Sequence, residues 1–345
     1  MTRSIVNFSA GPAMLPEAVM LRAQSEFMDW QGIGKSVVEI SHRSEEFMSI
    51  AEHAESTLRQ IMAIPEHYHV LFLRGKTTAD YLVTGVWSNK AAQIAAPYVQ
   101  ANIACHAQAS GFQSIPEQQD WQLDPDAAYC YYVSNETIEG LEFGFVPDTG
   151  DVPLVCDMTS SILSRVIDIN DYGLVFAGAQ KNIAPAGMTV VIVNDELLSN
   201  VLPATPALLD YRQQAEADCM LNTPPTFNWY MAGLMFDWII EQGGVLELER
   251  QNRLKAKMLY ELIDNSSFYV NRIDKACRSD MNVVFKLGDE SLNETFLEQA
   301  KSRGLHAIKG HRLAGGMRAS LYNAMPEAGV KQLADFMREF ERTQT

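Results

Sequence analysis

Short runs of apolar residues alternate with amphipathic segments along most of the chain. A short apolar run bounded by turn residues is typical of a buried strand, and apolar residues at every third or fourth position are typical of a helix. Extended segments are therefore predicted at residues 36–40, 69–73, 77–84, 128–133, 153–156, 174–177 and 188–193. Helices are predicted at residues 16–30, 44–64, 88–96, 225–242 and 245–264. This alternation favours an α/β domain with a mostly parallel sheet flanked by helices.

The last part of the chain repeats the alternation on a smaller scale. Strands and helices are predicted at residues 282–286, 292–302, 317–322 and from 326 to the C-terminus. The helix predicted at 245–264 is rich in polar residues and is expected to link two domains. We therefore predict a large domain over residues 16–248 and a smaller α/β domain formed by residues 1–15 and 249–345.

Charge and cysteine content narrow the possible partners. The 345 residues carry a formal net charge of −16, whereas nucleic acids and anionic membranes attract basic surfaces, so neither is an expected partner. No apolar run reaches the length of a membrane span. The five cysteines are dispersed and the N-terminus lacks an apolar signal core, which indicates a reduced, cytoplasmic protein without a metal site.

One lysine stands between two predicted buried strands. Lys181 follows the strand at 174–177, and the strand at 188–193 begins shortly after it. Thr137 and Asp157 also follow predicted strands, and parallel sheets bind ligands at these strand ends. A lysine can form an imine with pyridoxal phosphate, and a carboxylate can keep the pyridine nitrogen protonated. The spacing alone also fits a surface lysine and a helix-capping aspartate.

Several short motifs occur in order between Asn7 and the C-terminus. They are F-S-A-G-P-A at 8–13, S-H-R at 41–43, S-N-E-T at 134–137, A-G-A-Q-K-N-I at 177–183, N-T-P-P-T-F at 222–227 and G-H-R-L-A-G-G-M-R-A-S at 310–320. In this combination the chain resembles the phosphoserine aminotransferase family, which are class-V aminotransferases of fold type I. The resemblance implies pyridoxal 5'-phosphate as the cofactor and a homodimer with a shared active site.

The resemblance implies five cofactor contacts within one subunit. Lys181 would be the Schiff-base lysine and would move the proton between the substrate Cα and the cofactor carbon. Asp157 would pair with the pyridinium nitrogen. Trp87 would stack on the ring, Thr137 would bond on the side of the phenolic oxygen, and Gln180 would bind the phosphate.

It also implies contacts across the dimer and with the substrate. Asn222 and Thr223 would reach the cofactor phosphate from the other subunit. Arg318 would bind the substrate α-carboxylate with help near Ser9, because the planar guanidinium suits a carboxylate. The substrate phosphate would be bound by His42, Arg43, His311 and Arg312.

The chain departs from the family pattern at one junction. After the strand that matches residues 70–73, the family has a glycine-rich turn and a helix whose N–H groups hold the cofactor phosphate. Here only Arg74 and Gly75 precede a segment that resembles the next strand, so the turn and helix are expected to be missing. These two residues are the candidates left for the phosphate contact, and so short a connection is unusual between parallel strands.

The resemblance implies transfer of an amino group between glutamate and 3-phosphohydroxypyruvate, which gives O-phospho-L-serine and 2-oxoglutarate in serine biosynthesis. The family also catalyses the 4-phosphohydroxythreonine step of pyridoxine biosynthesis. The shortened junction leaves a second hypothesis, a non-catalytic or weakly active relative that has lost the cofactor-phosphate cradle. A third is a class-V enzyme with another substrate; a desulfurase is disfavoured because no cysteine lies in an evident loop near the C-terminal motifs.

Overall fold

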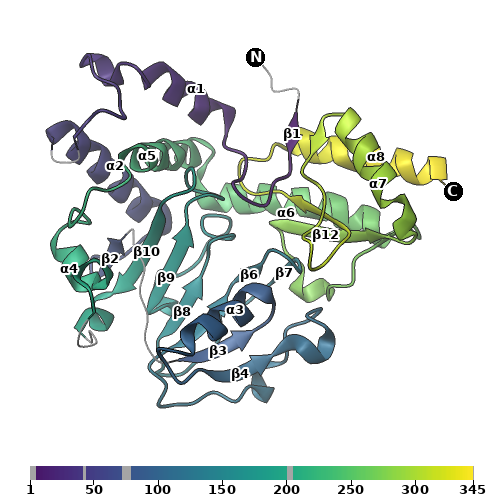
Figure 1. Cartoon of the computed structure of the whole chain (residues 1–345), viewed down its shortest axis with the longest axis horizontal. Coiled ribbons are helices and arrows are strands. Elements are labelled where there is room, and N and C mark those ends of the chain that lie inside the picture. Colours follow the sequence, from purple (N-terminus) through teal and green to yellow (C-terminus); the bar gives the residue numbers. More distant parts are fainter. Residues whose placement is uncertain (1–4, 42–43, 72–78, 200–204, 345) are drawn as a thin grey trace.

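A central sheet organises the computed structural model, which describes residues 5–41, 44–71, 79–199 and 205–344. Within them, seven strands lie in the order β2-β10-β9-β8-β5-β3-β4 (Figure 1). β10 is antiparallel to both neighbours and the other neighbouring strands are parallel, so the predicted mostly parallel sheet is confirmed. The strands are β2 (Tyr68–Leu71), β3 (Asp80–Val83), β4 (Asn102–His106), β5 (Cys130–Val133), β8 (Leu154–Asp157), β9 (Leu174–Gly178) and β10 (Thr189–Asn194).

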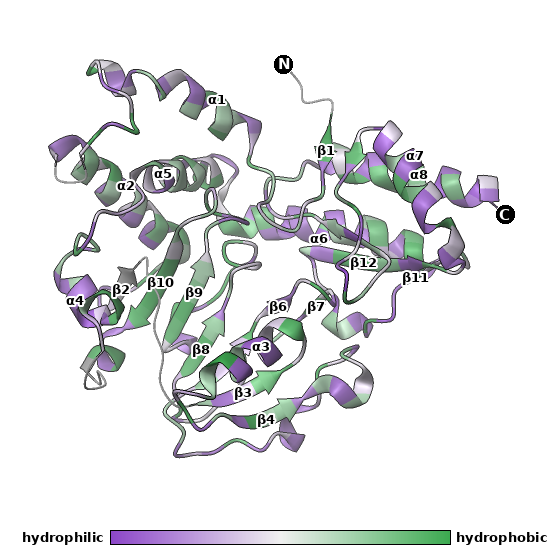
Figure 2. Cartoon of the chain, in the orientation of Figure 1, coloured by the Kyte–Doolittle hydropathy of each residue, from purple (hydrophilic) through white to green (hydrophobic). Residues whose placement is uncertain are grey.

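Helices cover both faces of this sheet. α2 (Glu45–Met62) and α5 (Thr226–Glu241) pack together on one face, and α3 (Val86–Ala95) lies on the other (Figure 1). Successive side chains of a strand point to opposite faces. Accordingly, Leu82 belongs to the core that contains α2 and α5, whereas its neighbour Tyr81 packs with α3. Figure 2 shows β8, β9 and β10 as mostly hydrophobic, which fits a sheet buried between two layers.

The start of α2 follows the prediction, and the segment before it does not. Ser44 is the N-cap residue, and its Oγ accepts a hydrogen bond from the N–H of Phe47 at 3.3 Å. The extended segment predicted at 36–40 is wrong, because residues 37–39 form a turn. The N–H of Glu39 donates to the carbonyl of Ser36 at 2.9 Å, and the N–H of Ser36 donates to the Glu39 carboxylate at 3.2 Å. Such local bonds compete with strand pairing.

Smaller elements complete the part of the molecule around the sheet. α1 (Glu17–Glu26) packs on α5, and α4 (Tyr211–Glu216) contacts β2. A short antiparallel pair, β6 (Asn135–Glu136) and β7 (Leu141–Glu142), follows β5 and leads toward the C-terminal part of the chain. None of the helices in the described ranges has the length and apolar character needed to cross a membrane.

A second unit lies beside the sheet and contains both ends of the described chain (Figure 1). β11, β12 and β14 form an antiparallel sheet, and β1 pairs in parallel with β13. Its elements are β1 (Val6–Asn7), β11 (Tyr269–Val270), β12 (Asn282–Leu287), β13 (Leu305–His306), β14 (Met317–Ser320), α7 (Asn293–Ser302) and α8 (Glu327–Gln344).

One helix spans the two hydrophobic cores. α6 (Gly244–Asp264) contributes Leu248 to the core of the central sheet and Ala256 to the core of the second unit. Phe8 from the N-terminal segment also packs in the second core. The presence of two hydrophobic cores supports the predicted division into a large and a small domain, which stays a proposal.

Candidate active site

A cavity of about 780 Å³ opens where the parallel strands of the central sheet end. Val133, Asp157 and Gly178, the last residues of β5, β8 and β9, all line it. Its volume suits a small cofactor together with a substrate. Seven of the predicted site residues line this cavity, namely Trp87, Thr137, Asp157, Gln180, Lys181, His311 and Arg318.

Lys181 reaches the cavity from a tight turn after β9. The N–H groups of Ile183 and Ala184 both donate to the carbonyl of Ala179, at 3.1 and 2.8 Å, which closes the turn around the lysine. Within the described residues, the Lys181 ammonium makes no hydrogen bond or ion pair. Burial lowers the pKa of Lys181 from 10.5 to about 8, although the Asp157 carboxylate acts in the opposite direction. About a tenth of this amine is therefore neutral and nucleophilic at pH 7, far more than for an ordinary lysine.

Asp157 ends β8 next to this lysine. Its Oδ1 accepts a hydrogen bond from the N–H of Thr159 at 2.8 Å. Burial raises the pKa of Asp157, whereas the bonds from Thr159 and the charge of Lys181 lower it. A carboxylate held in this way offers a negative charge to a cationic partner inside the cavity.

Trp87 and Thr137 form one side of the cavity together. The indole Nε1–H of Trp87 donates to Thr137 Oγ1 at 2.9 Å. Trp87 is 39% exposed although it is a large aromatic residue, so much of its ring is free for a ligand. The carbonyl of Thr137 accepts a hydrogen bond from Arg318 Nη1 at 2.8 Å, which places a guanidinium next to the indole.

Cationic groups gather at the side of the cavity formed by the C-terminal unit. Arg318 lies on β14, and His311 lies in the loop before that strand. Burial lowers the pKa of His311, and the positive charges of Arg318 and Arg312 lower it further. The positive charge of Arg318 in the cavity, with that of Arg312 nearby, favours an anionic ligand on this otherwise acidic protein.

Several predicted site residues lie elsewhere or cannot be placed. Asn222 and Thr223 line a smaller cavity of about 280 Å³, which adjoins the larger one at Gly187, Met188 and Thr189. Arg312 is exposed and Ser9 is partly buried; neither lines the larger cavity, although Ala10 beside Ser9 does. The predictions for His42, Arg43, Arg74 and Gly75, and the expected missing turn and helix, lie outside the described residues.

The sequence interpretation missed Asn135, which also lines the cavity. Its Nδ2 donates to Ser160 Oγ and to Asn282 Oδ1, both at 2.9 Å, so it joins the large unit to the C-terminal unit. The signal was present, because Asn135 belongs to the S-N-E-T motif after β5, but an asparagine at a strand end is common in ordinary turns.

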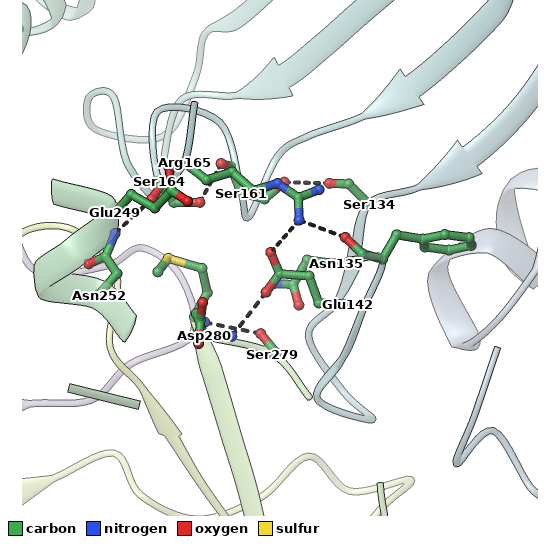
Figure 3. A network of polar contacts seen from close by, with 12 residues as sticks. Ser134, Asn135, Glu142, Ser161, Ser164, Arg165, Glu249, Asn252, Ser279 and Asp280 are labelled. Carbon is green, nitrogen blue, oxygen red and sulfur yellow. Dashed lines mark hydrogen bonds and ion pairs between the residues drawn. The ribbon is translucent and has the colours of Figure 1, made fainter. Parts of the chain in front are cut away.

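A buried polar network lies next to Asn135 (Figure 3). Arg165 Nη1 donates to the carbonyl of Phe143 at 2.6 Å and pairs with Glu142 Oε1 at 3.4 Å. The other carboxylate oxygen of Glu142 accepts from the N–H of Asp280 at 3.0 Å. These bonds fix β7 to the C-terminal unit near the cavity. In the described part of the chain no group of three or more His, Cys, Asp or Glu is placed to hold a metal ion.

Comparisons with known proteins identify the family. Residues 5–333 match the family described as Aminotransferase class-V. The chain is 52% identical to the phosphoserine aminotransferase of Laribacter hongkongensis (strain HLHK9), with 98% of this chain and 99% of the relative covered. That alignment spans 356 residues, more than the 345 of this chain, so the relative contains residues without a counterpart here.

Solved structures give the same result. Phosphoserine aminotransferase from Bacillus circulans subsp. alkalophilus is 40% identical and superposes with a TM-score of 0.96 over 99% of both chains. The pyridoxal-phosphate-bound phosphoserine aminotransferase from Trichomonas vaginalis is 39% identical and superposes with a TM-score of 0.91, over 97% of this chain and 99% of that one. The chain therefore belongs to the class-V aminotransferases and, within them, to the phosphoserine aminotransferase family.

Proposed function

We propose that the chain is a pyridoxal-phosphate-dependent phosphoserine transaminase. It moves an amino group between glutamate and 3-phosphohydroxypyruvate and forms O-phospho-L-serine and 2-oxoglutarate, as in serine biosynthesis; it also accepts the analogous 4-phosphohydroxythreonine of pyridoxine biosynthesis. The observation that carries this proposal is the Lys181 amine, which has no hydrogen-bond partner among the described residues and faces a cavity with Asp157 on one side and Arg318 and His311 on another. The names of the relatives give the substrate class.

The residues of the cavity fit pyridoxal phosphate. The cofactor needs an amine for its aldehyde, a carboxylate for its ring nitrogen, a flat surface for its ring and donors for its phosphate. Lys181, Asp157 and the exposed face of Trp87 supply the first three. The side-chain amide of Gln180 has no hydrogen-bond partner among the described residues and is available to the phosphate. When bound, the cofactor supplies an electron sink for the substrate Cα.

The protein side chains then have distinct tasks. Lys181 Nζ would hold the cofactor, and the freed amine would take and return the proton at the substrate Cα, which its lowered pKa of about 8 allows near neutral pH. The negative charge of Asp157 would hold a proton on the ring nitrogen. Thr137 would bond on the side of the phenolic oxygen, and it holds the Trp87 indole in place.

The substrate carries a carboxylate and a phosphate, and different basic side chains bind each group. Arg318 binds the α-carboxylate, with help near Ser9, and the Thr137 carbonyl orients its guanidinium. The substrate phosphate is bound by His42, Arg43, His311 and Arg312. Burial, and then the charges of Arg318 and Arg312, lower the pKa of His311, and a bound phosphate would act in the opposite direction.

The active form is a cytoplasmic homodimer. Asn222 and Thr223 are exposed, which supports their contact with the cofactor phosphate of the second subunit; the cavity that they line adjoins the one around Lys181. Exposed apolar residues nearby support the same interface, namely Leu208, Leu209 and Leu221.

The central experiment measures cofactor binding and turnover on purified protein. Addition of pyridoxal phosphate is expected to produce the visible absorption band of the lysine-bound cofactor and formation of phosphoserine from 3-phosphohydroxypyruvate and glutamate. Lys181→Ala is expected to abolish both, whereas Lys257→Ala, which changes an exposed lysine paired with Glu261, is expected to leave both unchanged. A wild-type protein without the band at saturating cofactor contradicts the proposal.

The comparisons give no evidence for the second hypothesis, a non-catalytic or weakly active relative, which rests on the shortened junction in the sequence alone. The two candidates differ in one measurement, turnover at saturating pyridoxal phosphate. Turnover with a raised cofactor Kd means an active enzyme with a weakened phosphate site, and no turnover despite the visible band supports the second candidate.

The phosphate role of Arg312 is tested by Arg312→Ala. We expect KM for 3-phosphohydroxypyruvate to rise roughly tenfold, because a charge-assisted contact is lost. KM for an unphosphorylated keto acid is expected to change little. Arg338→Ala, at an exposed arginine of α8 paired with Asp335, is the matched control. Equal effects on both substrates contradict this role.

A further inference from the structure

Two carboxylates cap the helix that carries Trp87. Glu136 Oε1 accepts from the N–H of Ser88 at 2.8 Å, and its Oε2 accepts from the N–H of Trp87 at 3.0 Å. Glu139 Oε1 accepts from the N–H of Val86 at 3.0 Å. The first N–H groups of a helix have no partner within the helix, and negative charge is favourable there. The start of α3 is therefore fixed by side chains from another part of the chain.

Consecutive residues hold Trp87 at two points. Glu136 binds its backbone N–H, and Thr137 binds its indole Nε1–H at 2.9 Å. The carbonyl of the same Thr137 accepts from Arg318 at 2.8 Å. Residues 136 and 137 thus fix the positions of both the Trp87 indole and the Arg318 guanidinium in the cavity.

The surroundings of Glu136 are shaped for its carboxylate. The residue is 0% exposed, and a Cβ atom on Gly85 would lie 2.6 Å from Glu136 Cδ, so only glycine leaves room for it. Burial raises the pKa of Glu136 to about 7, and the charge of Glu139 adds to this effect. Two neighbouring buried carboxylates destabilise a fold unless their hydrogen bonds compensate, which indicates that these hydrogen bonds have a specific task.

We propose that Glu136 is a positioning residue, whose carboxylate fixes the first turn of α3 and so holds the Trp87 indole against the cavity, flat to the ring of the bound cofactor. The last part of this inference rests on the proposed function, whereas the hold on Trp87 does not. Glutamate is required because both of its oxygens accept an N–H. Glutamine of the same size offers one acceptor and turns an N–H₂ group toward the other donor.

The first test uses the cofactor-free protein and compares Glu136→Gln with the matched control Glu139→Gln. Above pH 7, where the Glu136 carboxylate is charged, hydrogen exchange resolved to single amides is expected to be roughly tenfold faster at Trp87 and Ser88 in Glu136→Gln, because a bond to a charged acceptor is lost. In Glu139→Gln the increase is expected at Val86 alone. Gly85→Ala keeps the carboxylate but displaces it, and is expected to act as Glu136→Gln does.

The second test follows the indole and the cofactor. The Trp87 contribution to fluorescence is the difference between each protein and its Trp87→Phe counterpart. In Glu136→Gln we expect a changed Trp87 emission, and a Kd for pyridoxal phosphate raised roughly tenfold. Unchanged exchange and emission, or equal changes in Glu139→Gln, overturn the proposal. A wild-type protein that binds no cofactor contradicts the proposed function instead, and the exchange experiment still decides the hold on Trp87.

Discussion

Two lysines with opposite surroundings lie in the same chain, Lys181 partly buried and Lys255 buried. Lys181 faces the 780 Å³ cavity without a hydrogen-bond partner among the described residues. Lys255, on α6, is 3% exposed and donates to the carbonyls of Tyr322 and Met325 at 2.8 and 3.1 Å. Burial lowers both pKa values, to about 8 for Lys181 and to about 7 for Lys255. A lowered pKa alone therefore does not identify a chemical group; an amine without partners in a cavity does.

A buried hydrogen-bond chain of three asparagines connects the neighbourhoods of the two lysines. Asn182, next to Lys181, accepts from the N–H of Asn323 at 3.1 Å. Asn252, one turn before Lys255, donates to Asn323 Oδ1 at 2.8 Å. Tyr322, whose carbonyl Lys255 binds, has a φ of 26°, a conformation that a non-glycine residue keeps only when its surroundings fix it. Lys255 thus stabilises the turn after the strand of Arg318, while Lys181 does the chemistry.

The largest expected difference between the two lysines is in catalysis. Lys181→Ala is expected to lower kcat by roughly 10⁴-fold, because the residue that moves the proton is lost. Lys255→Ala is expected to keep most of the activity of the folded protein. Steady-state assays on both variants at saturating cofactor make the comparison. A Lys181→Ala protein with wild-type kcat would show that the free amine is not the catalytic group.

The next largest effect is expected at Asp157, because its carboxylate acts on the pKa of Lys181, whereas burial alone acts on that of Lys255. Asp157→Asn is expected to lower kcat by roughly 100-fold, because the charge that keeps the ring nitrogen protonated is lost. In the cofactor-free protein the same variant is expected to lower the pKa of Lys181 below about 8, because Asp157 opposes the effect of burial there. Asp237→Asn, at a partly exposed carboxylate paired with Arg22, is the control. Unchanged kcat and an unchanged lysine pKa would remove Asp157 from the proposed site.

The difference between the lysines also limits what the sequence can predict. Lys181 could be found because it interrupts two apolar runs, and Asp157 and Thr137 because they follow buried strands. Lys255 lies in a helix with many polar residues, and its burial comes from a turn about seventy positions later in the chain. Glu136 was visible in its motif, but its role depends on contacts with α3 that no local pattern contains. Asn222 and Thr223 line a smaller cavity beside the Lys181 cavity, and their contact with a second subunit stays a prediction, because one chain does not test it.

Reaction with an aldehyde separates the two amines by pH. The neutral amine is the nucleophile, so labelling of Lys181 in the cofactor-free protein is expected to rise about tenfold per pH unit and to level off above the pKa of about 8. Lys255 has a lower pKa but is expected to stay unlabelled, since it is 3% exposed and is bonded to two carbonyls. Borohydride trapping with an aliphatic aldehyde, followed by peptide mass spectrometry, measures both sites. Equal labelling of the two lysines would show that exposure to the cavity does not control reactivity.

The smallest expected effect is on stability, and its pH dependence identifies its source. Lys255→Met leaves two buried carbonyls unpaired and is expected to reduce the free energy of unfolding by about 1–3 kcal/mol, whereas Lys257→Met on the exposed side of α6 should change it by less than about 0.5 kcal/mol.

The folded-state pKa of Lys255, about 7, lies below the ordinary 10.5. Between these values the unfolded chain binds more protons, so stability rises with pH because of this lysine. The difference between wild type and Lys255→Met should therefore widen from pH 7 toward pH 10.5 and stay constant below pH 7. Denaturant unfolding of the two cofactor-free proteins at several pH values measures this difference. Lys181 contributes equally to wild type and to Lys255→Met, so its titration cancels. A difference in the free energy of unfolding that does not change with pH would mean that Lys255 stays charged in the folded protein.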